Sequence, residues 1–382
     1  MATATSKFSL DLYNKFSIKN KNLIISPFSV FTALAMVSLG SKGQTMDEIY
    51  KTLNIQHLGD DVHQAFHYYT SLLQGLTNVT LNNANGMFVK PGTQLLPEFS
   101  NKMKQFYDAK VQEFDFSNPK GPEAPINDWV SKQTAGMIKD FLKPGSVDGN
   151  TIMWLINAIY FKGTWKNIFN ERLTRKQKFH VSKTTQVDVD MMTLSEKMFR
   201  YKRLDNLKTT VMELPYVGDR YSMYILLPDD IEGLSTLESS LDATSLESAL
   251  TSKNSHLLSG MDKITRFIIT MPKFSLGSSL KLNQPLQDLG LNKIFDGRQA
   301  DLSGITGKQN LVVNSVIQKA VIDVTESGTR AAAVTGIGIV LTSSVHLPPR
   351  YLRIDHPFMF AIRDKQTNTN LFMGRYTDPR SA

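Results

Sequence analysis

One stretch near the C-terminal end of the chain decides the fold. It reads Glu326-Ser-Gly-Thr-Arg-Ala-Ala-Ala-Val-Thr-Gly-Ile-Gly-Ile-Val-Leu-Thr342 and continues as Ser343-Ser-Val-His-Leu-Pro-Pro-Arg350. If this stretch is extended, alternate residues share a face. The face that begins at Thr329 is small at first and apolar afterwards: Thr329, Ala331, Ala333, Thr335, Ile337, Ile339 and Leu341. Arg330 lies on the opposite face, so the stretch can enter the interior of a sheet without burying a charge.

Two interpretations of this stretch are open at this point. It is either a fixed strand of a sheet or a loop that is able to become a strand. Gly336, Gly338 and the following Pro348-Pro349 weaken a fixed strand and favour the loop.

The composition is that of a large globular protein. The chain has 382 residues, of which 41% are hydrophobic and 20% charged, and it contains no Cys. The hydrophobic and charged fractions exclude a disordered chain and collagen. The absence of Cys excludes a disulfide scaffold, a thiolate metal site and a Cys nucleophile. Met1–Lys7 is polar and contains no signal peptide, and apolar runs such as Phe31–Leu39 are too short to span a bilayer. We therefore expect a soluble protein without a membrane contact.

Hydrophobic periodicity predicts one continuous α+β domain over residues 1–382. Phe28–Leu39 is apolar nearly all round and follows the start signal Ser26-Pro27, which predicts a buried helix. Ile126–Leu142 has the spacing of an amphipathic helix, with Ile126, Trp129, Val130, Met137, Ile138 and Phe141 on its apolar face. Ile152–Phe161 fits a central strand. Further strands are expected at Met223–Leu227, Phe267–Met271, Leu311–Val313 and Met359–Ile362.

The net charge of +8 is concentrated in residues 162–208, which hold twelve Lys and Arg against five Asp and Glu. A solvated basic face is the first interpretation, and weak binding of a polyanion is the second. Nucleic acid is not expected as a partner, because the segment lacks interleaved aromatic platforms and recognition motifs.

Motifs of an enzyme are missing. The chain has neither G-x-S-x-G nor H-E-x-x-H, and His63 and His67, four residues apart, are interpreted as two surface histidines without a third metal ligand. We predict no enzyme activity, no metal and no cofactor.

The stretch after Glu326 resembles the hinge and reactive-centre loop of a serpin. That hinge usually reads E-x-G-T-E-A-A-A-x-T, and this chain matches it at Glu326, Gly328, Thr329, Ala331, Ala332, Ala333 and Thr335. Other serpin motifs follow in order along the whole chain: Asn22–Ser29, Ala84–Phe88, Asn157–Trp165, Met271–Phe274, Ala300–Gly304, Asp355–Phe358 and Phe372–Arg375.

The resemblance implies a serpin fold with three β-sheets, about nine helices and an exposed reactive-centre loop at about 326–350. It also implies a metastable, monomeric, extracellular inhibitor that traps a serine protease as an acyl-enzyme by inserting this loop into the large sheet. A cytoplasmic location stays open, as do a non-inhibitory carrier or chaperone and cross-class inhibition of a cysteine protease. A glycan cofactor is not expected, since Asp60–Leu73 contains no Lys or Arg.

Residue roles carry over from the matched motifs. The hinge comprises Glu326 and Gly328–Ala333, where Arg330 replaces the usual Glu. The breach, an ion pair at the top of the sheet, would be Lys273 with Glu326 beside Trp165. The shutter, a hydrogen-bonded cluster under the opening strands, would be Ser26, Ser29, Asn157 and Gln318. Gln318 stands where the family usually has His, so a pH-linked shutter is in doubt.

The reactive bond follows from counting along the loop. Counting from the hinge gives Thr342-Ser343, with Leu341-Thr342 as the alternative. Counting back from Pro357 gives His346, because the loop is about four residues longer than usual. Thr342 suits an elastase-like pocket and Leu341 a chymotrypsin-like one. No Lys or Arg occurs from Ala331 to Pro349, which argues against trypsin-like targets. Asn78-Val79-Thr80 is a glycosylation acceptor if the chain is exported.

Overall fold

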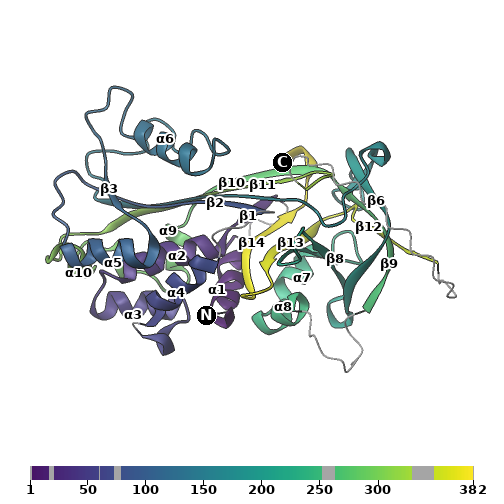
Figure 1. Cartoon of the computed structure of the whole chain (residues 1–382), viewed down its shortest axis with the longest axis horizontal. Coiled ribbons are helices and arrows are strands. Elements are labelled where there is room, and N and C mark those ends of the chain that lie inside the picture. Colours follow the sequence, from purple (N-terminus) through teal and green to yellow (C-terminus); the bar gives the residue numbers. More distant parts are fainter. Residues whose placement is uncertain are drawn as a thin grey trace.

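The computed structural model describes residues 2–16, 21–59, 61–72, 79–251, 263–328 and 348–381 (Figure 1). These residues form ten α-helices and fourteen strands, and the strands belong to two hydrogen-bonded sheets. None of the described helices has the length and apolar character that a bilayer crossing requires. The α+β class predicted from the sequence is confirmed.

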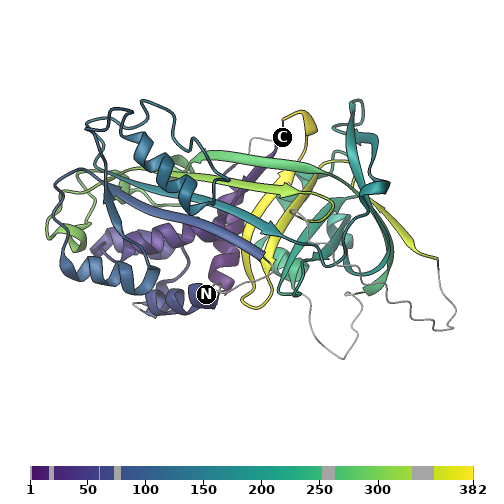
Figure 2. The same cartoon turned by 45° about the horizontal axis from the view of Figure 1, so that its top comes forward.

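The five-stranded sheet carries the candidate site. Its strands, in spatial order, are β10 (Phe274–Lys281), β11 (Val313–Val324), β4 (Met153–Gly163), β2 (Val79–Val89) and β3 (Val111–Glu113) (Figure 2). β4 is the central strand that the apolar run predicted, and it is buried along almost its whole length. β11 runs parallel to β4 and pairs with it directly, from Val313 opposite Met153 to Ile322 opposite Phe161.

The other sheet has nine strands. Its path is β1 (Leu23–Ile25), β14 (Thr369–Tyr376), β13 (Phe358–Asp364), β8 (Tyr221–Pro228), β7 (Thr209–Pro215), β6 (Gln186–Leu204), β9 (Lys263–Pro272) and β12 (Arg350–Arg353), with β5 (Arg175–His180) on β6. The 19-residue β6 pairs with β5 and β9 and then, at its end, with β7. It thereby joins two of the three expected sheets into one hydrogen-bonded network.

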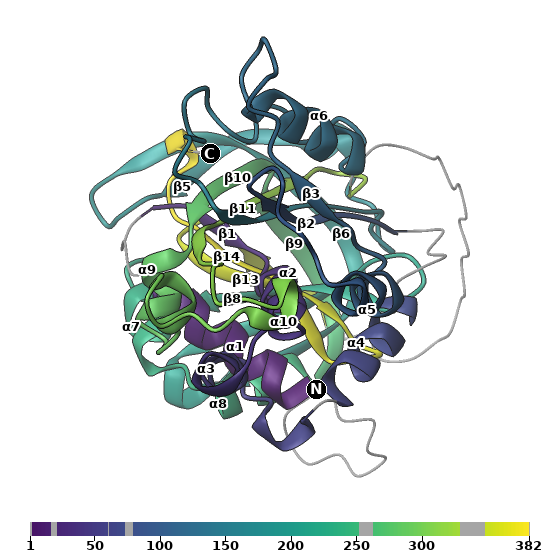
Figure 3. The same ribbon diagram turned by 90° about the vertical axis from the view of Figure 1, so that its left-hand side faces the viewer.

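Helices cover both faces of the five-stranded sheet. Figure 3 shows α6 over one face and the bundle with α1, α2 and α3 on the other. The helices are α1 (Ala2–Asn14), α2 (Pro27–Ser38), α3 (Gly43–Thr52), α4 (Asp61–Leu72), α5 (Pro97–Tyr107), α6 (Glu123–Gln133), α7 (Leu234–Ser240), α8 (Ala243–Leu250), α9 (Asn283–Gln287) and α10 (Ser303–Thr306).

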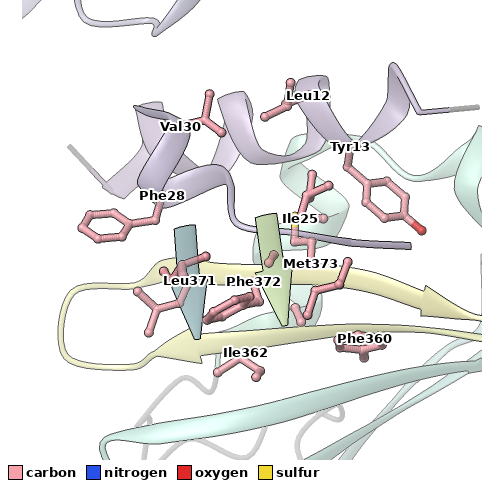
Figure 4. Close-up of a cluster of buried hydrophobic side chains, with 14 of the residues drawn as sticks. Leu12, Tyr13, Ile25, Phe28, Val30, Phe360, Ile362, Leu371, Phe372 and Met373 are labelled. Atoms are coloured by element: carbon pink, nitrogen blue, oxygen red, sulfur yellow. The ribbon is translucent and has the colours of Figure 1, made fainter. Parts of the chain in front are cut away.

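The α2 helix was predicted correctly and lies in the centre of the molecule. Ser26 caps its N-terminus, Pro27 occupies the first turn, and every residue of the helix is buried. Phe28 and Val30 of α2 pack with Leu12 of α1 and Phe372 of β14 in one apolar cluster (Figure 4). Burial on all sides explains why the sequence of α2 has no polar face.

Three predictions about local structure were wrong. The helix predicted over Ile126–Leu142 ends at Gln133, because Ala135 and Gly136 have φ values of 51° and 77° that no α-helix accepts. The strand predicted at Leu311–Val313 begins only at Val313. His63 is buried and its Nδ1 lies 2.8 Å from the hydroxyl of Tyr107, so it is not a surface histidine. His67 is exposed, as predicted.

Candidate functional site

Three amide side chains form a row across the five-stranded sheet. Asn85 of β2, Asn157 of β4 and Gln318 of β11 are register partners on adjacent strands. Nε2 of Gln318 donates to Oδ1 of Asn157 at 2.7 Å, and Nδ2 of Asn157 donates to Oδ1 of Asn85. The row therefore ties β2, β4 and β11 together through side chains as well as backbone.

The N-terminus of α2 meets this row. The backbone N–H of Ser26 donates to Oε1 of Gln318 at 2.9 Å, and Nε2 of Gln318 donates to the carbonyl of Ser26 at 2.9 Å. Oγ of Ser29 donates to Oδ1 of Asn157 at 2.5 Å, and Oγ of Ser26 donates to the carbonyl of Leu371 at 2.7 Å. The structure thus brings together all four residues predicted for the shutter.

Burial makes these hydrogen bonds costly to lose. Ser26, Ser29, Asn157 and Gln318 are all fully buried. A buried donor or acceptor that loses its partner costs about 1–3 kcal/mol. An amide can both donate and accept here, and it carries no charge at any pH, so this cluster contains no titrating group at position 318.

A second polar cluster lies where β11 ends. Nζ of Lys273 is 2.9 Å from Oε2 of Glu326, and Oγ1 of Thr174 donates to Oε1 of Glu326 at 2.9 Å. The Glu326 side chain is only 8% exposed, whereas Lys273 is 45% exposed. Burial alone would raise the pKa of Glu326, but the hydrogen bonds from Lys273 and Thr174 outweigh it and hold this pKa below its ordinary value.

Trp165 holds the backbone beside this ion pair. Its ring stacks on Tyr216 at a centroid distance of 4.4 Å, and its Nε1 donates to the carbonyl of Thr325 at 2.9 Å. The backbone N–H of Trp165 donates to the carbonyl of Ser327 at 3.2 Å, and that of Phe169 to the carbonyl of Glu326 at 2.9 Å. Residues 325–327 are therefore bonded to the chain that follows β4.

A tight turn closes the described part of the hinge. The backbone groups of Thr325 and Gly328 exchange hydrogen bonds of 3.2 and 3.1 Å, and Gly328 has φ of 94°. A Cβ at Gly328 would lie 2.1 Å from the carbonyl oxygen of Gly163. Both the dihedral angle and the close approach require glycine here.

The remaining predicted residues lie outside the described part of the chain. These are Thr329, Arg330, Ala331, Ala332 and Ala333 of the hinge, Leu341, Thr342 and Ser343 of the reactive bond, the alternative His346, and the acceptor Asn78.

The basic segment 162–208 is partly neutralised by ion pairs. Lys166, Lys176, Lys178 and Lys183 pair with Asp219, Asp190, Asp188 and Asp230 at 2.6–3.0 Å, and Arg203 pairs with Asp229. Most of these side chains are at least half exposed, so the pairs add little stability but lower the local charge. Within the described ranges no group of three or more His, Asp and Glu could hold a metal.

Sequence reasoning missed four partners of these clusters. Asn85 belongs to a motif that the sequence contains, but its place in the amide row depends on strand register. Thr174, Tyr216 and the carbonyl of Leu371 carry no local signal, because they reach their partners from distant parts of the chain.

The two sheets, the buried α2 and the hinge that follows β11 define a fold of the serpin class. A family model described as "Serpin (serine protease inhibitor)" matches residues 3–379. The chain belongs to the serpin family.

Similar proteins cover the chain almost completely. Human Serpin B3 is 34% identical and human leukocyte elastase inhibitor 36% identical, each over 99% of both chains. The crystal structure of Serpin48 from the insect Tenebrio molitor has a TM-score of 0.86 and 32% identity, over 99% of this chain and 97% of that one. Human thyroxine-binding globulin, solved in complex with thyroxine, has a TM-score of 0.87 and 28% identity, over 99% of this chain and 98% of that one.

Proposed function

We propose that this single-domain protein is a suicide-substrate inhibitor of serine endopeptidases with chymotrypsin-like or elastase-like specificity. The serine Oγ of the protease attacks the carbonyl carbon of Thr342. The Thr342–Ser343 peptide bond breaks, Ser343 leaves with a protonated amine, and Thr342 remains as an ester on the protease. Insertion of the cleaved loop then carries the protease away before water hydrolyses the ester.

The direct pairing of β4 with β11 is the observation that carries this proposal. These strands are parallel neighbours, and the turn at Thr325–Gly328 reverses the chain after β11. A strand that continues from this turn would enter between them antiparallel to both. One parallel pairing would then be replaced by two antiparallel ones, which are slightly more stable per residue. Fifteen inserted residues would span about 50 Å.

The side chains of the loop support insertion. The inward face begins with Thr329, Ala331 and Ala333, which are small enough to enter before the strands have separated widely. Arg330 would stay on the outward face. In this proposal the shutter cluster and the Lys273–Glu326 pair act as gates, because both must rearrange when β4 and β11 part.

The test is incubation with chymotrypsin, elastase, trypsin and papain in parallel, read by denaturing gels and by the mass of the released C-terminal peptide. We expect a gel-stable complex with chymotrypsin or elastase and a peptide that begins at Ser343 or Thr342. A complex with papain alone would replace the proposal by cross-class inhibition. Cleavage without any complex would contradict inhibition.

Two matched variants test insertion itself. Ala331→Arg places a charge on the inward face, so it should convert the inhibitor into a substrate that is cleaved without trapping. Ala332→Arg places the same charge on the outward face, where Arg330 already stands, and should leave trapping intact. Equal trapping by both variants would rule out insertion in this register.

A non-inhibitory carrier is the second candidate, favoured by the similarity to thyroxine-binding globulin. It predicts that every protease that cuts the loop does so without forming a complex, and that the two arginine variants behave equally. For the inhibitor, the proposal also includes a monomer that acts outside the cell, with the cytoplasm as the alternative. Only weak polyanion binding is proposed for residues 162–208, because acidic partners neutralise much of this segment.

A further inference from the structure

One face of the nine-stranded sheet exposes apolar side chains next to the end of the reactive loop. We call it the loop-base face and define it by Met198 of β6, Ile264, Arg266 and Ile268 of β9, Tyr351 of β12, and Arg200 of β6. Strand register places these residues together: Met198 pairs with Arg266, Arg200 with Ile264, and Tyr351 with Ile268. Two strand spacings, about 10 Å, separate β12 from β6.

The exposure of this face is unusual for the molecule. Tyr351 is 75% exposed, and Met198 and Ile264 are each 56% exposed. In the described part of the chain, Tyr68 on α4 is the one other large apolar residue that is more than half exposed. Large apolar side chains gathered on one solvated face are typical of a surface that binds another protein.

The strand that carries Tyr351 is held firmly. Its neighbour Arg350 points to the opposite face, where it donates to the hydroxyl of Tyr201 at 2.8 Å and lies 5.5 Å from the centre of that ring. Tyr201 in turn packs edge-on against Phe267. Because these contacts hold the Arg350 side chain on one face of β12, Tyr351 is presented to solvent on the other face.

A hollow adjoins the face. It has a volume of about 470 Å³, and its lining includes Met198, Arg200, Ile264 and Tyr224. Arg200 makes no ion pair with any residue of the described ranges, so its guanidinium is available to an acidic partner group. The face thus combines an aromatic side chain, a recess and an arginine without an ion pair to any described residue, which are features of binding hot spots.

The short length of chain between the reactive bond and Tyr351 indicates which protein would cover the loop-base face. Tyr351 follows Ser343 by only eight positions, which span at most about 29 Å. A globular domain of about 200 residues has a radius of gyration of about 16 Å and is therefore about 40 Å across. A protease bound at Thr342-Ser343 extends over this distance. A stable interface also buries about 800 Å² on each partner.

We propose that the loop-base face is a docking surface for the target protease, with Tyr351 as its anchor and Arg200 selecting proteases that carry an acidic group beside an apolar surface. This inference rests on the proposed function and concerns the choice of protease and the rate at which it is captured. The chemistry at the reactive bond is unaffected by it.

The test compares Tyr351→Ala with Tyr68→Ala, which removes another tyrosine that is more than half exposed, on α4, far from β12 in Figure 1. Two quantities are measured with the protease that forms the complex: the second-order rate constant of inhibition and the stoichiometry of inhibition. We expect Tyr351→Ala to lower the rate constant about 10-fold at unchanged stoichiometry. Tyr351→Phe should retain the wild-type rate, and Arg200→Ala should weaken the salt dependence of the rate.

Binding to chymotrypsin and elastase whose nucleophilic serine is replaced by alanine separates docking from trapping. We expect Tyr351→Ala to weaken this non-covalent binding about 10-fold and Tyr68→Ala to leave it unchanged. If the wild-type chain traps no protease but the binding difference persists, the proposed function fails and the docking surface stands. If wild type and Tyr351→Ala trap and bind equally, or if the wild-type chain binds neither protease, the docking surface is refuted.

Discussion

Gln318 of β11 and Asn157 of β4 are register partners whose side chains are joined by a hydrogen bond of 2.7 Å. The same Gln318 amide bonds both backbone groups of Ser26. One side chain thus links the two parallel strands to each other and to the start of α2. In the proposed mechanism these two strands separate, so this link must break before the loop can insert.

Replacement of Gln318 by alanine should destabilise the native state. Gln318→Ala leaves the N–H of Ser26 and Oδ1 of Asn157 without this partner in a site that is closed to solvent. We expect the free energy of unfolding in urea to fall by about 2–5 kcal/mol. Gln284→Ala removes a solvent-exposed glutamine that bonds Asp288, and it should change stability by less than about 0.5 kcal/mol. Similar losses in both variants would show that the cluster around Gln318 contributes no special stability.

The sequence predicted the parts of the fold whose signal is local. The all-apolar run after Ser26-Pro27 became the buried α2, and the run at Ile152–Phe161 became the central β4. The break after Gln133 was missed because the apolar residues on both sides of it, Val130 and Met137, keep helical spacing, while Ala135 has a left-handed φ of 51° that the spacing does not reveal.

The site was predictable only where family motifs mark it. The ion pair between Lys273 and Glu326 was predicted because both residues lie in serpin motifs. Thr174 was not, since nothing in its sequence neighbourhood indicates that it reaches Glu326 across 152 positions. Likewise, the exposure of Tyr351 cannot be read from the sequence, because alternation along a four-residue strand does not say which face is covered.

Loss of Lys273 should ease the opening of the sheet. In Lys273→Ala the buried carboxylate of Glu326 keeps Thr174 but loses its cation, which costs the native state about 1–3 kcal/mol. We expect spontaneous conversion to an inactive, loop-inserted form at 45 °C to accelerate by up to about 5- to 150-fold, measured as loss of inhibitory activity with retention of monomer. Lys176→Ala removes the exposed partner of Asp190 close by and serves as the control. An unchanged conversion rate in Lys273→Ala would show that the ion pair does not gate insertion.

Acidic pH should remove the contribution of the Glu326 carboxylate to the stability of the folded protein. Its pKa is lowered in the folded protein, since the hydrogen bonds from Lys273 and Thr174 outweigh the effect of burial. The folded state therefore binds fewer protons than the unfolded one, so this stabilisation is complete above the ordinary value of 4.5 and is lost as the pH falls through the lower, folded pKa. We expect the stability difference between wild type and Glu326→Gln to be constant from pH 8 to 5 and to shrink below 4.5. A difference that stays constant down to pH 3 would contradict this.

The turn at Gly328 should tolerate no side chain. Gly328→Ala would place a Cβ 2.1 Å from the carbonyl oxygen of Gly163, and φ of 94° is strained for alanine. The hinge must then move away from Trp165, and the hydrogen bonds from Trp165 to Ser327 and Thr325 are lost.

Gly277→Ala on the edge strand β10 is the matched control, because its Cβ meets nothing closer than 3.7 Å. We expect limited proteolysis at the hinge to accelerate about 10-fold or more in Gly328→Ala and to stay at the wild-type rate in Gly277→Ala. Since Trp165 stacks on Tyr216 in the closed hinge, its fluorescence should change in Gly328→Ala as well. If proteolysis and fluorescence both match the wild type, the contact between Gly328 and Gly163 does not hold the hinge closed.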